Sequence, residues 1–94
     1  MTKYSTNKKT NAVLNMIEQQ LQDLGLEEIK HYKQNFPNEL DYNLVQYGCL
    51  LVYYEDIRQM YITAGYKAEN WSNEKLWQGY KRQVRYIANQ LLQS

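Results

Sequence analysis

Apolar side chains recur at helical spacing along most of the chain, with polar side chains between them. The first such segment, residues 11–24, carries four of them at intervals of three or four: Val13, Ile17, Leu21 and Leu24. This interval places the side chains on one face of an α-helix, and Gly25 follows where a glycine commonly ends a helix. A shorter helix over about residues 27–35 is predicted next, because Pro37 disfavours helical geometry in the residue before it.

The longest predicted helix covers residues 39–64. Asn38 is a favourable N-cap, Asp41 places negative charge in the first turn, and Gly48 is the one helix breaker before residue 65. The apolar residues of this segment cover most of the helix circumference, and a helix of that kind is buried on several sides. Because a chain of 94 residues has little else to cover it, we expect self-association or a partner surface.

The last predicted helix covers about residues 74–93, after a loop at residues 65–73. Its apolar residues form a seam for an antiparallel partner, at intervals of three and four: Trp77, Tyr80, Val84, Ile87 and Leu91. The loop lets this helix pair with the preceding one as a hairpin. The pattern therefore predicts an all-α protein, a small bundle of about four helices dominated by a long antiparallel helical hairpin.

Composition adds expectations about domains and compartment. Residues 1–10 are polar and predict a flexible basic arm ahead of a single helical domain at residues 11–94. The single cysteine, Cys49, has no partner for an internal disulfide, so we interpret it as a buried structural thiol and expect a reducing compartment. No run of about 18 apolar residues is present. We therefore predict a cytoplasmic protein with no membrane association.

Residue types that could form an enzyme site are scarce. His31 is the one histidine, and the four glycines are too far apart to form a phosphate-binding loop. Glu55 and Asp56 are adjacent, and adjacent side chains on a helix point about 100° apart, so they are better interpreted as solvated or ion-paired than as an acid–base couple. We predict a non-enzymatic protein that has no cofactor and no metal site.

Charge is distributed unevenly. Residues 18–56 carry eight acidic side chains against two lysines, whereas residues 57–94 carry six basic side chains against two acidic ones. On a helical wheel of the last helix, the basic residues form one flank beside the apolar face, with an aromatic residue among them. Such a flank suits contacts with phosphates and stacking on bases. Together with the lysines near the N-terminus, it predicts contact with double-stranded DNA. The predicted contact residues are Lys75, Lys81, Arg82, Arg85, Tyr86, Lys8 and Lys9. An ordinary solvated helix face explains the same pattern.

The ten tyrosines exceed what a core of this size can bury, and tyrosine is enriched at protein interfaces. The predicted interface residues are Tyr47, Tyr53, Tyr54, Arg58 and Tyr61. Arg58 falls on the apolar side of its predicted helix. Three interpretations are open for this residue. Its side chain extends the charge to solvent, it pairs with an acid such as Glu55 or Glu18, or it anchors an interface.

Two segments of the chain carry a resemblance to a known family. An acid-led helix opens with Asn38-Glu39-Leu40-Asp41 and ends in Ala64-Gly65-Tyr66, and a later helix contains Arg82-Gln83-Val84-Arg85-Tyr86-Ile87-Ala88. In this arrangement, residues 38–92 resemble the helical core of the P27-like family of phage terminase small subunits. The resemblance implies a ring-forming, non-enzymatic protein that marks viral DNA for packaging, with Arg82 and Arg85 as the positions to test.

Two functions follow from these patterns. The first is a phage or mobile-element helical adaptor that self-associates into a homo-oligomer and contacts DNA mainly through phosphates. The alternative is a small helical inhibitor or immunity-type protein that binds another protein through a tyrosine-rich surface.

Overall fold

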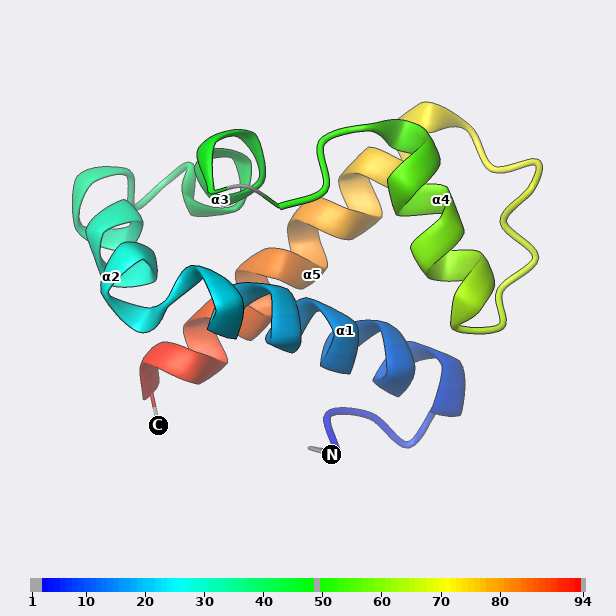
Figure 1. Ribbon diagram of the computed structural model, residues 1–94, viewed down its shortest axis with the longest axis horizontal. Helices are drawn as coiled ribbons and strands as arrows, with labels where there is room; N and C mark the ends of the chain where they lie inside the picture. The colour runs from blue at the N-terminus through cyan, green and yellow to red at the C-terminus, as the bar shows by residue number, and fades with distance from the viewer. Residues whose placement is uncertain (1–2, 49, 94) are drawn as a thin grey trace.

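The computed structural model describes residues 3–48 and 50–93, and these residues form five α-helices and no β-strand (Figure 1). The helices are α1 (Lys8–Leu24), α2 (Leu26–Asn35), α3 (Leu40–Tyr47), α4 (Tyr54–Thr63) and α5 (Asn73–Gln93). The predicted all-α fold class is confirmed, and the described part of the chain contains five helices where about four were expected.

α1 is bounded by two local signals. The side chain of Asn7 accepts a hydrogen bond from the backbone N–H of Thr10 at 3.0 Å, so the helix begins three residues before its predicted start. Lys8 and Lys9 therefore lie in its first turn. At the other end, Gly25 adopts a φ of +104°, a conformation that residues other than glycine rarely adopt. α2 begins directly after this glycine.

The single helix predicted over residues 39–64 is wrong, because this segment forms two helices. α3 ends at Tyr47 with Gly48 as its C-cap, and α4 begins after Tyr53, whose backbone is extended. Residues 50–52 lie between the two helices and are not helical.

Tertiary contacts explain this break. The backbone N–H of Leu51 donates to the hydroxyl of Tyr80 at 3.3 Å, and Leu50 is buried in the core. Gly48 packs against the side chain of Leu24. A Cβ atom at position 48 would lie 3.1 Å from a methyl group of Leu24, and it would also clash with the carbonyl oxygen of Leu44. Distant residues thus fix a connection that local helix propensity does not predict.

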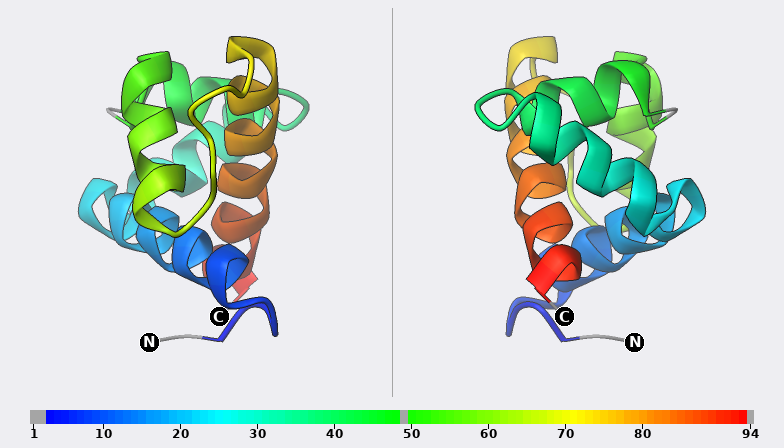
Figure 2. Two further views of the ribbon diagram at one scale, coloured as in Figure 1. Left: turned by 90° about the vertical axis from the view of Figure 1, so that its right-hand side faces the viewer. Right: turned by 90° about the vertical axis from the view of Figure 1, so that its left-hand side faces the viewer.

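The predicted antiparallel hairpin is also wrong. In Figures 1 and 2, α4 and α5 run in the same general direction, and residues 64–72 carry the chain back beside α4. Nine extended residues can span about 30 Å, whereas the ten residues of α4 rise only about 15 Å. The loop is therefore long enough to return the chain to the level where α4 began.

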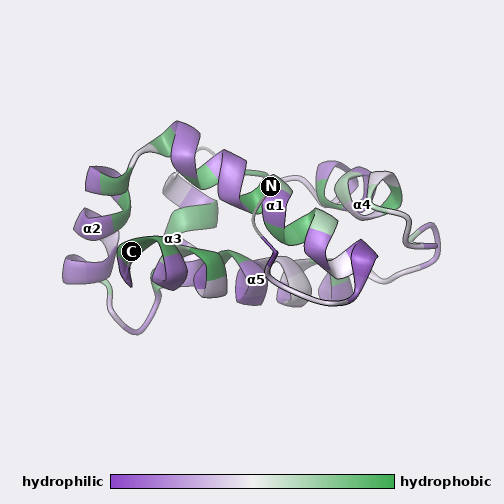
Figure 3. Ribbon diagram, turned by 90° about the horizontal axis from the view of Figure 1, so that it is seen from below, coloured by the Kyte–Doolittle hydropathy of each residue, from purple (hydrophilic) through white to green (hydrophobic). Residues whose placement is uncertain are grey.

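α5 is the central element of the fold, because it contacts each of the other four helices. Hydrophobic residues of α1 and α5 lie on the sides that face each other (Figure 3). Three residues of the predicted seam, Tyr80, Val84 and Ile87, are fully buried, and Trp77 and Leu91 pack at the edge of the core.

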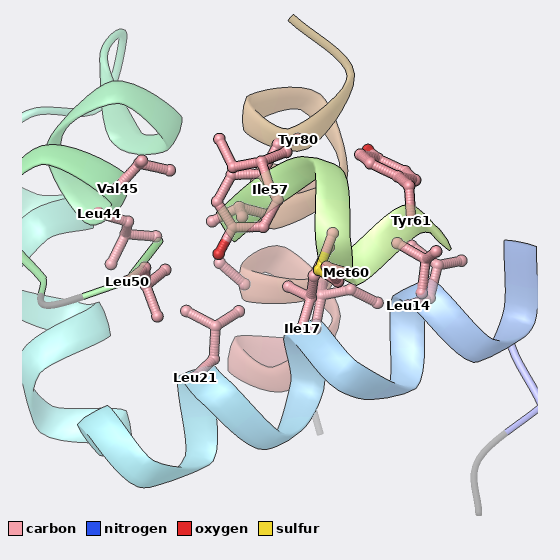
Figure 4. Packing of buried hydrophobic residues seen from close by; sticks show 14 of the residues in the cluster. Leu14, Ile17, Leu21, Leu44, Val45, Leu50, Ile57, Met60, Tyr61 and Tyr80 are labelled. Atoms are coloured by element: carbon pink, nitrogen blue, oxygen red, sulfur yellow. The ribbon is translucent and has the colours of Figure 1, made fainter. Parts of the chain in front are cut away.

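Tyr80 lies at the centre of the packed side chains, between residues of α3 and α4 (Figure 4). Its hydroxyl donates to the Oε1 of Gln20 at 2.6 Å and accepts from the N–H of Leu51. One side chain of α5 thereby joins α1 to the connection between α3 and α4.

Candidate interaction surfaces

The connection between α3 and α4 presents the largest group of exposed hydrophobic side chains that are close in sequence. We call Tyr47, Val52, Tyr53 and Tyr54 the tyrosine surface; their side chains are 61%, 41%, 71% and 46% exposed. Three of these residues were predicted at an interface, whereas Val52 was not, because that prediction rested on the tyrosines. Tyr42, on α3, is exposed as well.

Negative charge borders the tyrosine surface. Glu55 and Asp56 occupy the first turn of α4 and are both exposed. No lysine or arginine occurs between residues 34 and 57. Glu55 accepts hydrogen bonds from Arg58 at 3.3 Å and from Gln59 at 3.2 Å. The surface is therefore aromatic with an acidic border.

Arg58 was predicted as an interface residue, and the structure gives it an internal role. One guanidinium nitrogen, Nη1, donates to the carbonyl oxygens of Ala68 at 2.7 Å, Glu69 at 3.2 Å and Trp71 at 2.8 Å. The side chain is only 16% exposed. Arg58 thus fastens the α4–α5 loop to α4, and it also forms an ion pair with Glu55, one of the three interpretations left open by the sequence.

Tyr61 was also predicted at an interface, but its side chain is buried. The hydroxyl donates to Oε1 of Gln83 at 2.5 Å, and the ring packs 5.7 Å from that of Tyr66 and 5.4 Å from that of Trp71. Burial raises the pKa of Tyr61, the neighbouring Tyr66 adds to this rise, and the charge of Arg82 opposes it. Tyr61 therefore belongs to an aromatic cluster below the surface.

The predicted basic residues of α5 divide into two groups. Lys75, Arg82, Arg85 and Tyr86 are exposed, and we call these four the basic flank. Lys81 is partly buried, with its Nζ 5.4 Å from the centre of the Trp77 ring. The ion pairs formed within residues 3–48 and 50–93, Lys30–Glu27 and Arg58–Glu55, involve no residue of the flank.

Three residues of the flank have neighbours of their own. Arg85 donates to the backbone carbonyl of Asn38 at 3.4 Å, and Lys75 lies 4.2 Å from the centre of the Trp71 ring. Tyr86 packs edge-on against Tyr4 at 6.3 Å between ring centres. Tyr4 lies in the segment predicted as a basic arm, and this contact was not expected.

The predicted N-terminal lysines lie near the start of α1. Lys8 and Lys9 are exposed, and the Nζ of Lys9 lies 6.0 Å from the centre of the Tyr66 ring. Because Tyr66 and Trp71 pack 5.6 Å apart, the structure places Lys9 and Lys75 at neighbouring rings of one aromatic cluster.

Shallow cavities are lined by described residues at two further places. One, of about 260 Å³, is lined by Lys30, Lys33, Gln34 and Leu92, and the other, of about 300 Å³, by Gln20, Asp23, Leu24 and Gly48. Neither lining includes a histidine, serine or threonine. His31 is exposed and contacts the side chain of Asn35 at 3.2 Å. Cys49, predicted as a buried thiol, lies outside the described residues.

No group of three or more histidine, cysteine or acidic side chains among the described residues could hold a metal ion. None of the helices described in the structure is long and apolar enough to cross a membrane.

Comparison of the chain with protein-family models, with curated proteins and with solved structures found no match. The resemblance of residues 38–92 to phage terminase small subunits therefore stays a prediction.

Proposed function

We propose that this chain is a non-enzymatic binding protein that recognises another protein through the tyrosine surface. The observation that carries the proposal is the exposure of four large side chains within eight consecutive residues. Single exposed hydrophobic residues are normal, but a group of them at one place is typical of an interaction site. Tyrosine suits such a site because its ring supplies contact area and its hydroxyl still bonds to a polar partner.

The backbone that carries this surface is held in place before any partner binds. Leu50 is buried beside it, and the N–H of Leu51 is bonded to Tyr80, which is bonded in turn to Gln20. A surface fixed in this way loses less conformational entropy on binding than a mobile loop does. This supports a role in recognition for the exposed side chains of the connection.

A photo-crosslinking amino acid in place of Tyr53 tests the proposal in the cells that naturally contain the chain. The matched control carries the same group in place of Glu28, which is exposed on α2. We expect protein adducts from position 53 and few from position 28. Equal labelling at both positions, or none at position 53, would contradict the proposal.

DNA contact is the second candidate function, and the basic flank favours it. The three cations of the flank pair with no carboxylate within the described chain, and an exposed tyrosine lies among them. Free cations on one helix side can neutralise phosphates, and this binding weakens as salt rises. The terminase resemblance implies the same activity.

Gel retention of double-stranded DNA at two salt concentrations tests this second function. Replacing both Arg82 and Arg85 with alanine is expected to weaken retention by about tenfold or more, through the loss of two phosphate contacts. A variant with Lys30→Ala and Lys33→Ala removes the same charge from α2 and serves as the control. Unchanged mobility of the arginine variant would rule out this use of the flank.

A further inference from the structure

We propose that the partner of the tyrosine surface is the basic flank of a second copy of this chain. This inference rests on the proposed function and names its partner. Each of the two surfaces combines exposed aromatic rings with charge of one sign. The tyrosine surface is bordered by Glu55 and Asp56, whereas the flank carries three cations around Tyr86.

The two surfaces do not neutralise each other within one molecule. In the part of the chain that the structure describes, the ion pairs join Lys30 to Glu27 and Arg58 to Glu55, so none links α5 to the start of α4. Arg85 contacts only a neutral carbonyl, that of Asn38, at 3.4 Å. Asp56 and the three cations of the flank take part in no ion pair of the described residues, so these charges are available to another molecule, where they would orient the encounter.

The aromatic residues supply the contact area for this pairing. Tyr53 is the most exposed large hydrophobic residue described, and Tyr86 is the exposed ring of the basic flank. Arginine stacks on aromatic rings and bonds to carboxylates, so Arg82 suits a surface that offers both. The contact therefore joins an aromatic and acidic surface to an aromatic and basic one.

Such an interface joins two different surfaces, so it is heterologous. When two copies join through one such contact, one keeps a free basic flank and the other keeps a free tyrosine surface. Copies therefore add head to tail, and they form a ring when the rotation between neighbours closes. This arrangement predicts a specific behaviour for mixtures of variants.

Two variants of the full chain each remove one surface. The first replaces Tyr53 and Tyr54 with alanine, and the second carries Arg82→Glu and Arg85→Glu. All four residues are exposed, so both variants are expected to keep the helical circular dichroism of the parent. Light scattering and sedimentation of the purified proteins then report assembly at low and high salt.

The parent protein is expected to self-associate, more weakly at high salt. Each variant alone is expected to associate at least about tenfold more weakly, because it has lost aromatic or charged anchors at the interface. A mixture of the two variants is expected to form a one-to-one dimer, because each supplies the surface that the other lacks. A variant with Lys30→Ala and Lys33→Ala is expected to assemble like the parent.

Three outcomes would overturn the inference: a parent that is monomeric at every concentration, a mixture that stays monomeric, or a flank variant that loses DNA retention but still assembles. A monomeric parent whose position 53 crosslinks a foreign protein contradicts this inference and leaves the proposed function standing. A parent without self-association and without adducts at position 53 contradicts both.

Discussion

The hydroxyls of Tyr61 and Tyr80 show how single residues connect distant parts of this chain. Each ring is buried, and each hydroxyl donates to a glutamine, Gln83 for Tyr61 and Gln20 for Tyr80. A buried hydroxyl without such a partner costs about 1–3 kcal/mol. The apolar pattern of α5 predicted that Tyr80 faces the core. It did not predict Gln20 as its partner, because the two residues are 60 positions apart in the chain.

We expect the burial of Tyr61 and Tyr80 to make the folded protein less stable at alkaline pH. Burial raises the pKa of Tyr61 and of Tyr80 above the usual value near 10, so the folded chain keeps both protons where the unfolded chain releases them. Their contribution is fully present below about pH 10 and decreases as the pH rises further. Each group lowers the free energy of unfolding by about 1.4 kcal/mol per pH unit in that range.

Urea unfolding at several pH values between 9 and 11.5 measures this effect. Tyr61→Phe and Tyr80→Phe should each reduce the pH slope by about one proton. Tyr86→Phe serves as the control, because that ring is exposed. Equal slopes in all four proteins would contradict the assignment to the two buried hydroxyls.

At the scale of elements, local signals and distant contacts determine different parts of the fold. α1 and α5 have clear apolar faces, and their predicted bounds lie within a few residues of the observed ones. The segment over residues 39–64 has apolar residues around most of its circumference, and Gly48 was the one local sign of the break after Tyr47. Packing against Leu24 and hydrogen bonding to Tyr80 decide that break, and neither contact is visible in the local sequence.

Arg58 shows the same limit at the α4–α5 loop. Its position on an apolar face left three interpretations open. The structure shows one of them, the ion pair with Glu55, and adds hydrogen bonds to loop carbonyls that none of the three included. Predicting this contact requires the path of residues 64–72, which the hairpin prediction had placed differently. Tyr47, Tyr53 and Tyr54 are exposed as an interface requires, whereas Tyr61 is buried and Arg58 is bonded internally. The interface itself stays a prediction.

Replacing Arg58 with alanine should destabilise the protein by about 2 kcal/mol, because the partly buried carbonyl groups of Ala68 and Trp71 lose their donor. Arg58→Lys should lie between the parent and the alanine variant, since one ammonium cannot reproduce the planar guanidinium. Urea midpoints followed by tryptophan fluorescence measure the loss. Gln59→Ala, at an exposed neighbour, is the control. A midpoint of Arg58→Ala equal to that of the control would contradict the role given to Arg58.

For the whole molecule, α5 is the element through which the other helices are joined. It contacts α1, α2, α3 and α4, while Tyr80 and the seam residues fill the space between them. Because α5 contacts every other helix of the described chain, the helices should unfold together. A change at the middle of this helix therefore tests the whole arrangement.

Ile87→Ala should destabilise the protein by about 2–5 kcal/mol, because Ile87 is fully buried and lies on the helix that contacts the other four. The free energy of unfolding of a natural domain is about 0.05–0.15 kcal/mol per residue. The expected loss is therefore a large share of the total stability of this chain. Far-ultraviolet circular dichroism and tryptophan fluorescence should lose their folded signals at one shared, lowered urea midpoint. Leu26→Ala, at an exposed position of α2, should lower it far less. Separate midpoints for the two signals would show that α5 does not join the helices into one cooperative unit.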